Sequence, residues 1–392
     1  MGLFDKCYNF KDADCIRSLG YYPYFRIIST EQDTEVMVNG QKMLMMGSNS
    51  YLGLTNHPRV KQAAIEATKK YGSGCAGSRF LNGTLDIHIT LEEELAKLVG
   101  KESSLVFATG YQANLGAISA IVGKNDYIIT DKYDHASIID GCRLSFGEML
   151  RYSHNDMNSL EKVLQKINGA NALIVVDGIF SMEGDIADLP KIVELCQKYK
   201  VNLMVDEAHS IGVLHSTGAG AAMHFGCTDK SDIIMGTFSK SLASVGGFIA
   251  ADQKIIDYLK HHARSLIFSA SLPPASAASV LEALKIMKEE PERIEKLWDN
   301  TNFMMDSFHE MGFNTGDSST PVIPLHVGEM MVAFKMWRRL AEEGVFVNPI
   351  VPPAVPPNSC LIRCSFMATH TKPQLEQALD KFKKIGKELG II

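Results

Sequence analysis

The sequence predicts an α/β protein built around a large, mostly parallel β-sheet. From about residue 55 to 285, short apolar runs alternate with helical patterns of about ten or more residues, which is typical of βα units. The apolar runs are continuous rather than alternating, as expected for strands that are covered on both faces. Polar and glycine-containing segments follow the ends of these runs, where an open α/β sheet binds its ligands.

Residues 1–50 form a predicted N-terminal arm. Within it, the run 36–45 has the pattern of a β-hairpin, with Asn39 and Gly40 as its two-residue turn. The arm is therefore expected to contain one hairpin ahead of the main sheet.

Residues 51–285 form the predicted large domain. Its candidate strands are 104–108, 127–130, 173–177, 203–206, 233–235 and 248–250. Its candidate helices are 58–71, 87–98, 114–122, 157–167 and 189–199. Because strands and helices alternate in this order, the sequence predicts parallel strands joined by crossover helices.

Residues 286–392 form a predicted smaller α+β domain. The segment SLPP at 271–274 interrupts the alternating pattern, and one long helical stretch is expected from Ala275 to about Met311. Two further apolar runs, 345–347 and 361–365, are predicted as strands. The proline-rich segment 349–357 between them is predicted as a loop.

The composition indicates an ordinary globular protein and excludes several classes of function. The 392 residues are 46% hydrophobic, and the net charge of −6 gives no electrostatic basis for binding nucleic acid or an anionic membrane. The eight cysteines lack a CxxC pair, which favours a reduced, cytoplasmic protein over a disulfide scaffold or a zinc site. We expect no signal peptide and no transmembrane segment, whereas peripheral membrane contact stays open.

Lys240 and Asp206 form the most informative pair in the sequence. Lys240 ends the hydroxyl-rich segment GTFSK at 236–240, and Asp206 ends an apolar run. Such a lysine suits a Schiff base with the aldehyde of pyridoxal 5′-phosphate (PLP), and such a carboxylate suits its pyridine nitrogen. Thr237 and Ser239 offer hydroxyls to the phosphate. Taken alone, Lys240 could be an ordinary surface lysine, and Asp206 could be a strand end or a helix cap. The two together predict a PLP site.

Two segments after neighbouring strands extend this site. Gly110 and Tyr111 follow the strand 104–108 and begin a helix, where exposed N–H groups suit a phosphate; an ordinary strand–helix turn is the alternative. His135 follows the strand 127–130 and is placed to stack on the pyridine ring and touch a substrate carboxylate. A structural histidine is the alternative reading of His135.

Three further polar residues complete the predicted constellation. Ser181 lies in a turn-rich loop after the strand 173–177. His209 is suited to hydrogen-bond the phenolic oxygen of the cofactor; with Asp206 it also fits a metal site, but no third ligand has suitable spacing. Arg363 alternates out of an apolar strand and suits a bidentate contact with an amino-acid carboxylate, or else a salt bridge to Asp or Glu.

In this order, the segments resemble the α-oxoamine synthases, a subfamily of fold-type I PLP enzymes. The resemblance covers nearly the whole chain and includes SNSYLGL at 48–54, GSGCAGSR at 72–79, the His135 segment, DEAH at 206–209, TFSK at 237–240 and Arg363. It implies a fold-type I transferase, with a large PLP-binding domain and a small C-terminal domain. It also implies decarboxylative condensation of an amino acid with an acyl-CoA thioester.

The resemblance assigns a role to each matching residue. Lys240 is expected to be the Schiff-base lysine and the base that removes the proton from Cα. His135 is expected to be the second catalytic residue, which stacks on the ring and helps to hold the substrate carboxylate. The expected cofactor contacts are Gly110, Tyr111, His135, Ser181, Asp206, His209, Thr237, Ser239 and Lys240, together with Ser269 and Ala270, which reach the partner subunit's phosphate in family dimers. The expected substrate contacts are Asn49, Ser78, His135 and Arg363.

Within the family, GSRFLNGTLDIH at 77–88 and MATHT at 367–371 are most similar to the serine palmitoyltransferase branch. This branch implies a homodimer that condenses L-serine with palmitoyl-CoA, or another long-chain acyl-CoA, to 3-oxosphinganine, CoA and CO2. The alternatives are glycine or alanine with a shorter acyl-CoA, as in 2-amino-3-ketobutyrate CoA ligase or 8-amino-7-oxononanoate synthase. A non-catalytic PLP-fold subunit is a further alternative, although such a subunit has no need of Lys240.

Overall fold

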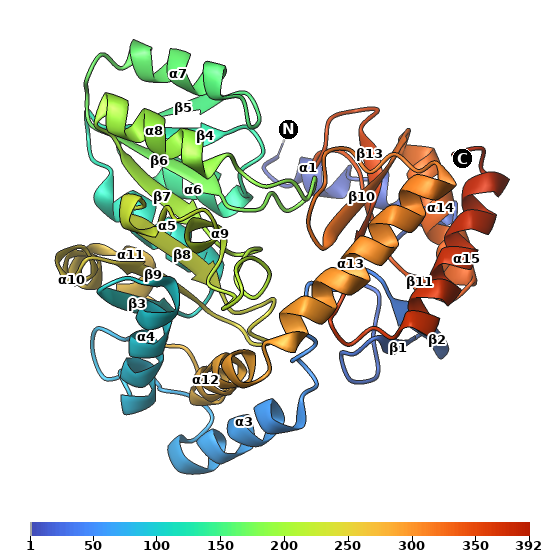
Figure 1. The fold of residues 1–392 in the computed structure, drawn as a ribbon, viewed down its shortest axis with the longest axis horizontal. Coiled ribbons are helices and arrows are strands. Elements are labelled where there is room, and N and C mark those ends of the chain that lie inside the picture. The colour runs from blue at the N-terminus through green and yellow to red at the C-terminus, as the bar shows by residue number, and fades with distance from the viewer. Residues whose placement is uncertain (1) are drawn as a thin grey trace.

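The computed structural model describes residues 2–392, with a large α/β domain beside a smaller α+β domain (Figure 1). The large domain contains strands β3 (Ser103–Phe107), β4 (Tyr127–Asp131), β5 (Glu148–Tyr152), β6 (Ala172–Asp177), β7 (Asn202–Asp206), β8 (Ile233–Thr237) and β9 (Gly247–Ala251). They form one sheet in the order β3-β9-β8-β7-β6-β4-β5. Only β9 runs against its neighbours among these seven strands, so the predicted mostly parallel α/β fold is confirmed.

Helices cover both faces of this sheet. One face carries α5 (Gly110–Ile121), α6 (Ala136–Leu144), α10 (Gln253–His262) and α11 (Arg264–Ile267). The other carries α4 (Asp86–Val99), α7 (Met157–Lys166), α8 (Leu189–Tyr199) and α12 (Pro274–Glu289), with α3 (Pro58–Tyr71) packed on α12. The short α9 (Ala221–His224) and the 3-10 turn Thr228–Lys230 lie between β7 and β8.

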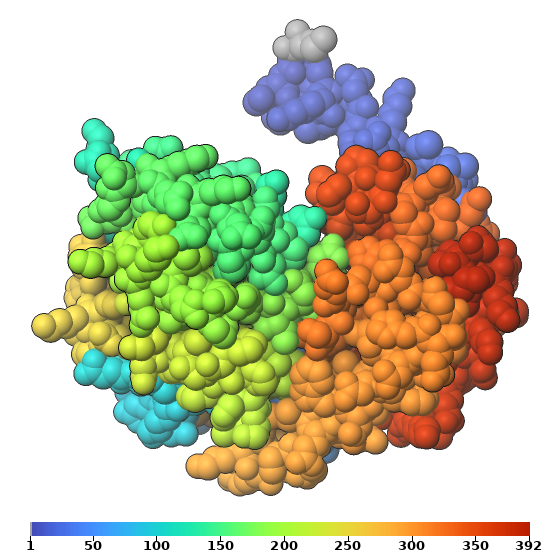
Figure 2. All heavy atoms as spheres, turned by 45° about the horizontal axis from the view of Figure 1, so that its top comes forward, coloured from blue at the N-terminus to red at the C-terminus, as the bar shows by residue number. Residues whose placement is uncertain are grey.

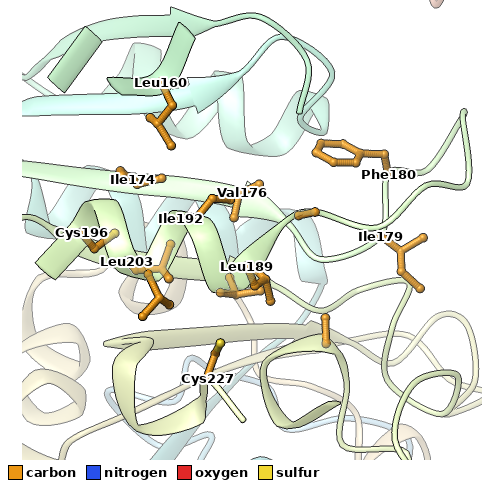
Figure 3. Packing of buried hydrophobic residues seen from close by; sticks show 14 of the residues in the cluster. Leu160, Ile174, Val176, Ile179, Phe180, Leu189, Ile192, Cys196, Leu203 and Cys227 are labelled. Atoms are coloured by element: carbon orange, nitrogen blue, oxygen red, sulfur yellow. The ribbon is translucent and has the colours of Figure 1, made fainter. Parts of the chain in front are cut away.

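Side chains along the central strands alternate between two apolar cores. On β6, Ile174 and Val176 belong to the core that includes Leu160 of α7 and Ile192 of α8, as Figure 3 shows. Leu173 and Val175 of the same strand belong to the core on the opposite face. Because both faces are buried, each strand reads as one continuous apolar run.

The N-terminal arm contains the predicted hairpin. Strands β1 (Glu35–Val38) and β2 (Gln41–Met45) pair antiparallel, and Asn39 and Gly40 adopt φ angles of 50° and 80° in the turn. Strand β2 also pairs in parallel with β11 (Val345–Phe346), which ties the arm to the C-terminal part of the chain. Ahead of the hairpin, α1 (Asp5–Tyr8) and α2 (Asp12–Ser18) have no fully buried residue, and the N-terminal end of the described chain projects from the molecule (Figure 2). Ile16 of α2 packs against the core of the small domain.

The C-terminal domain is a small antiparallel sheet covered by helices. Strands β10 (Val322–Gly328), β13 (Cys360–Ser365) and β12 (Asn348–Ile350) form it in that order. Helices α13 (Glu292–Met311), α14 (Met330–Glu342) and α15 (Lys372–Glu388) supply side chains to its core. The division of the chain at residues 50 and 285 stays a prediction.

Two sequence predictions for this region are wrong in detail. The single helix expected from Ala275 to about Met311 is two helices, α12 and α13, with Glu290 and Pro291 between them. A residue before proline is disfavoured in the helical region, and Glu290 leaves it with a ψ angle of 62°. The strand expected at 345–347 is likewise divided, because β11 ends at Phe346 and β12 begins at Asn348.

A segment of the arm lies along β13 and joins it to the large domain. The Ser365 N–H donates to the Met46 carbonyl at 3.0 Å, and the Ala368 N–H donates to the Tyr51 carbonyl at 2.7 Å. The Ser365 hydroxyl donates to the Ser48 carbonyl at 2.7 Å. These bonds fix residues 46–51 beside the strand that carries Arg363.

The loop after β6 contacts the small domain through a glycine that tolerates no side chain. Gly184 has a φ angle of 72°, and a Cβ atom there would lie 2.0 Å from the Val322 carbonyl oxygen. The Gly184 carbonyl accepts hydrogen bonds from the Ser319 N–H and the Thr320 hydroxyl. This contact holds the loop that presents Ser181 to Arg363.

We predict that Gly184→Ala lowers the free energy of unfolding by at least about 2 kcal/mol more than Gly169→Ala. Both positions carry a positive φ angle, which costs alanine about 1 kcal/mol, but Gly169 has no atom within 4 Å of the added Cβ. The difference therefore isolates the backbone clash at Val322. Denaturant titration of both variants measures it, and equal losses would contradict the contact.

Candidate active site

A cavity of about 540 Å³ lies where loops at the carboxyl ends of the parallel strands meet the small domain. This size is typical of small-molecule sites. Among the residues that the sequence predicted, the cavity brings together Asn49, Gly110, Tyr111, His135, Ser181, Asp206, His209, Thr237, Ser239, Lys240 and Arg363.

One end of the cavity is a cradle suited to a phosphate. Gly110 begins α5, and Thr109 caps this helix by accepting a hydrogen bond from the Gln112 N–H at 3.1 Å. A Cβ atom on Gly110 would lie 2.7 Å from Thr237 Oγ1, so only glycine allows the backbone this close to the hydroxyls. Thr237 Oγ1 and Ser239 Oγ are 3.1 Å apart. Free N–H groups of the helix start and two hydroxyls together match an anion.

Asp206 lies at the floor of the cavity and is 2% exposed. Its carboxylate accepts hydrogen bonds from the Asn114 amide at 2.7 Å and from the Ala208 N–H at 2.9 Å. Asp177, its register partner on β6, is also buried, and burial raises the pKa of Asp177 well above its usual range, with Asp206 adding to the shift. Burial therefore favours the neutral form of Asp177 over a second anion beside the Asp206 carboxylate.

The Lys240 amine faces this carboxylate from the loop after β8. Burial lowers the pKa of Lys240 to about 8, and Arg363 contributes to the lowering. Asp206 and Asp177 oppose the shift. An amine with this pKa is partly neutral near physiological pH, which suits both a nucleophile and a proton acceptor.

Two neutral histidines line the cavity. Burial lowers the pKa of His135, and it lowers that of His209 further, with the charges of Lys240 and Arg363 adding to the second shift. The His135 Nδ1 atom accepts a hydrogen bond from the Ser137 N–H at 3.2 Å, which orients the ring at the start of α6. His209 Nδ1 lies 2.7 Å from the hydroxyl oxygen of Tyr51.

Arg363 brings a buried guanidinium to the cavity from β13. It is 5% exposed, and its Nε donates to the Ser181 carbonyl at 2.7 Å while Nη1 donates to Asn49 Oδ1 at 3.0 Å. Within residues 2–392, no carboxylate forms an ion pair with Arg363, so the salt-bridge alternative is not observed. The remaining N–H groups of the fork suit an incoming carboxylate.

Three of the predicted site residues lie outside the cavity of their own chain. Ser78 is buried, and its hydroxyl has no hydrogen-bond partner in the described chain. Ser269 accepts a hydrogen bond from the Gln112 amide at 3.0 Å, and Ala270 is exposed beside it. The substrate role of Ser78 and the partner-phosphate role of Ser269 and Ala270 stay predictions.

The cavity also includes residues to which sequence reasoning gave no role. Asn114 lies one helical turn after Gly110, a spacing that places both on the same face of α5 and was visible in the sequence. Asp177 ends β6, which lies next to the strand that carries Asp206. Its position at the end of the predicted strand 173–177 was a signal that could have identified it. Asn348 and Ile350 come from β12, which the sequence concealed because Pro349 argues against a strand.

The residues present fit PLP. The cradle around Gly110 suits its phosphate, the carboxylate of Asp206 suits a protonated ring nitrogen, and the Lys240 amine suits its aldehyde. His209 offers a polar contact for the phenolic oxygen. By contrast, no group of three or more His, Cys, Asp or Glu side chains within residues 2–392 is arranged to hold a metal ion.

Comparisons with known proteins show which family the chain matches. The aminotransferase class I and II family matches residues 41–382. Serine palmitoyltransferase of Sphingobacterium spiritivorum is 55% identical over 390 residues, covering 99% of this chain and 98% of the relative. 8-Amino-7-oxononanoate synthase of Thermoanaerobacter pseudethanolicus is 43% identical over 379 residues, covering 96% of each chain. A serine palmitoyltransferase variant from S. paucimobilis, solved with bound PLP–myriocin, superposes with a TM-score of 0.96 at 34% identity and full coverage of both chains.

We predict that the apoprotein captures PLP covalently at a rate that rises with pH and levels off above about pH 8. The protonated amine is not a nucleophile, and the Lys240 amine loses its proton near this pH, whereas an ordinary lysine does so near pH 10.4. Borohydride quenching followed by peptide mass spectrometry measures capture at Lys240, with the exposed Lys97 as internal reference. A rate that keeps rising to pH 10 would contradict the lowered pKa.

Proposed function

This chain belongs to the aminotransferase class I and II family, and we propose that it condenses L-serine with a long-chain acyl-CoA, most simply palmitoyl-CoA. The reaction joins serine and palmitoyl-CoA and yields 3-oxosphinganine, CoA and CO2, the first step of sphingolipid synthesis. The observation that carries the proposal is that one cavity holds both the Lys240 amine and the Arg363 guanidinium, in a chain 55% identical to a serine palmitoyltransferase. Within residues 2–392, this guanidinium forms no ion pair with a carboxylate.

PLP is the proposed cofactor, and when bound it supplies a ring that stabilises negative charge at the α-carbon of an amino acid. Asp206 acts at the ring nitrogen, because a carboxylate held by Asn114 and the Ala208 N–H keeps a proton there. Gly110, Thr237 and Ser239 hold the phosphate.

Lys240 moves the protons of the reaction. Its amine, with a pKa of about 8, accepts the proton from the serine α-carbon and later returns one to the same carbon after CO2 is lost. Between these transfers, the α-carbon attacks the thioester carbonyl, and CoA leaves as the thiolate, which takes a proton from solvent. Lys240 is suited to both transfers because burial lowers its pKa to a value at which the amine can accept a proton and return it.

Arg363 and His135 orient the amino acid. Two N–H groups of Arg363 are held by Ser181 and Asn49, so the fork is fixed before substrate binds. The remaining N–H groups bind the serine carboxylate, and His135 is the second contact. A carboxylate bound in this way is held in one orientation relative to Lys240, which favours its loss as CO2 after condensation.

No helix within residues 2–392 has the length and apolarity needed to cross a bilayer. All eight cysteines are free thiols. We propose the cytoplasm as the site of the reaction, because free thiols persist in a reducing compartment.

The substrates are tested by assaying L-serine, glycine and L-alanine, each with acetyl-, pimeloyl- and palmitoyl-CoA. We expect the highest kcat/KM for serine with palmitoyl-CoA. The relative from Thermoanaerobacter pseudethanolicus favours a second candidate, 8-amino-7-oxononanoate synthesis from alanine and pimeloyl-CoA. Preference for that pair, or for glycine with acetyl-CoA, would overturn the serine assignment.

We predict that Arg363→Lys weakens serine binding by about tenfold or more and PLP binding by much less. Lysine keeps the charge but loses the planar fork that matches a carboxylate. Titration of serine against the cofactor absorbance measures the first constant, and titration of PLP into the apoprotein measures the second. Arg339→Lys is the matched control, since Arg339 forms a two-point contact with Glu388 on the surface. Unchanged serine affinity would remove Arg363 from the substrate site.

We propose a homodimer in which each cavity is completed by the partner chain. Ser269 and Ala270 lie outside the cavity of their own chain, as the expected cross-subunit contact requires. Several apolar side chains near these residues and the cavity are exposed, namely Phe80, Leu81, Tyr111, Val245 and Phe268. An interface over this surface would bury them.

The shared site predicts complementation between two inactive variants. Lys240→Ala and Ser269→Tyr chains, mixed and exchanged, form dimers with one site free of both changes. Since about half of the dimers are mixed and each has one intact site, activity should return to about one quarter of the wild-type rate. Tagged chains verify exchange. No recovery after verified exchange would contradict a shared site.

A further inference from the structure

Tyr51 is buried beside His209 and Arg363 of the site. The proposed function gives it no role in binding the phosphate or the substrate. Tyr51 is 1% exposed, and its hydroxyl oxygen lies 2.7 Å from His209 Nδ1. Its carbonyl accepts a hydrogen bond from the Ala368 N–H, which fixes the backbone of the segment along β13. The phenol is therefore held against His209 by the small domain.

The direction of this hydrogen bond follows from the surroundings of the two groups. Burial raises the pKa of Tyr51, with Arg363 opposing the shift, so the phenol keeps its proton. Two groups lie beside the hydroxyl, the Arg363 guanidinium and His209 Nδ1. A guanidinium only donates, so among residues 2–392 the acceptor for the phenol proton is His209 Nδ1. A buried O–H group without an acceptor is costly, so the phenol donates and Nδ1 accepts.

A neutral imidazole has one nitrogen that donates and one that accepts. The His209 ring is kept neutral by burial and by the nearby Lys240 and Arg363, which lower its pKa well below the usual range. If Nδ1 accepts from Tyr51, the ring proton is on Nε2. His209 also lines the cavity, and Nε2 is the nitrogen left for a ligand there.

We propose that Tyr51 is a positioning residue that fixes His209 in the Nε2–H tautomer, so that the cavity presents a hydrogen-bond donor to an anionic phenolic oxygen. Only the identity of the ligand, PLP, rests on the proposed function. His135 is arranged in the same way, because the Ser137 N–H donates to its Nδ1 atom. Both histidines then present Nε2–H groups, one set by a backbone amide and the other by a phenol.

The tautomer is measured by 15N NMR of the histidine-labelled apoprotein, with no PLP, serine or acyl-CoA present. The His209 signals are assigned by their loss in His209→Gln. We expect the wild-type protein to show a protonated Nε2 and an acceptor Nδ1. In Tyr51→Phe, which keeps the buried ring and removes only the hydroxyl, we expect the proton to be shared between both nitrogens.

Tyr152→Phe is the matched control. Tyr152 is also 1% exposed, and its hydroxyl has no hydrogen-bond partner among the described residues. This variant should leave the His209 signals unchanged. A wild-type ring protonated on Nδ1, or an unchanged tautomer in Tyr51→Phe, would overturn the proposal, and the wild-type spectrum decides even if the variant folds poorly.

PLP affinity gives a second readout. Titration of the apoprotein should show a Kd about three- to tenfold higher in Tyr51→Phe, since a misplaced proton turns a hydrogen-bond donor into an acceptor facing an anion. Tyr152→Phe should change the Kd less than about twofold. An altered tautomer with unchanged PLP affinity would refute the link to the cofactor oxygen. If no PLP binds even to wild type, the proposed function fails while the tautomer result stands.

Discussion

The buried carboxylate of Asp206 is the charge on which the arrangement of the cavity depends. A buried anion is stable only with hydrogen bonds and a counter-charge, and here Asn114, the Ala208 N–H and the Lys240 amine supply them. Asp177 beside it is also buried, and burial together with the neighbouring Asp206 raises its pKa, which disfavours a second anion at this depth. The Asp206 carboxylate matches a ligand that carries a proton on a ring nitrogen.

The opposite wall of the cavity comes from the small domain and the N-terminal arm. Arg363 lies on β13, and Asn49 and Tyr51 lie on the segment 46–51 that is hydrogen-bonded beside that strand. Contacts from this wall to the large domain, from Arg363 to the Ser181 carbonyl and from Tyr51 to His209, fix the guanidinium and the phenol relative to the loops around Lys240. The placement of the two domains therefore sets the orientation of a substrate relative to the base.

Much of the fold and of the site could be predicted from the sequence, and the gaps have physical causes. The central strands could be predicted because both of their faces are apolar, whereas the edge strand β5 carries two exposed charged residues, Glu148 and Arg151, which interrupt its apolar pattern. Lys240 and Asp206 were readable because each ends a clear strand or turn pattern. The raised pKa of Asp177 was not, because it depends on burial and on an aspartate of the neighbouring strand. Roles such as that of Ser269 depend on a second chain, which one sequence does not place.

Exchange of the serine α-proton with deuterated water, followed by NMR, tests most directly whether Asp206 controls the site. The account predicts that Asp206→Asn lowers the exchange rate by about 100-fold or more, since an amide does not hold the ring proton as a carboxylate does. Asp177→Asn should lower it far less, because burial already disfavours the charge of Asp177 and the amide oxygen can keep the hydrogen bond that the carboxyl group accepts from the His135 N–H. An unchanged rate in Asp206→Asn, or equal losses in both variants, would contradict the account.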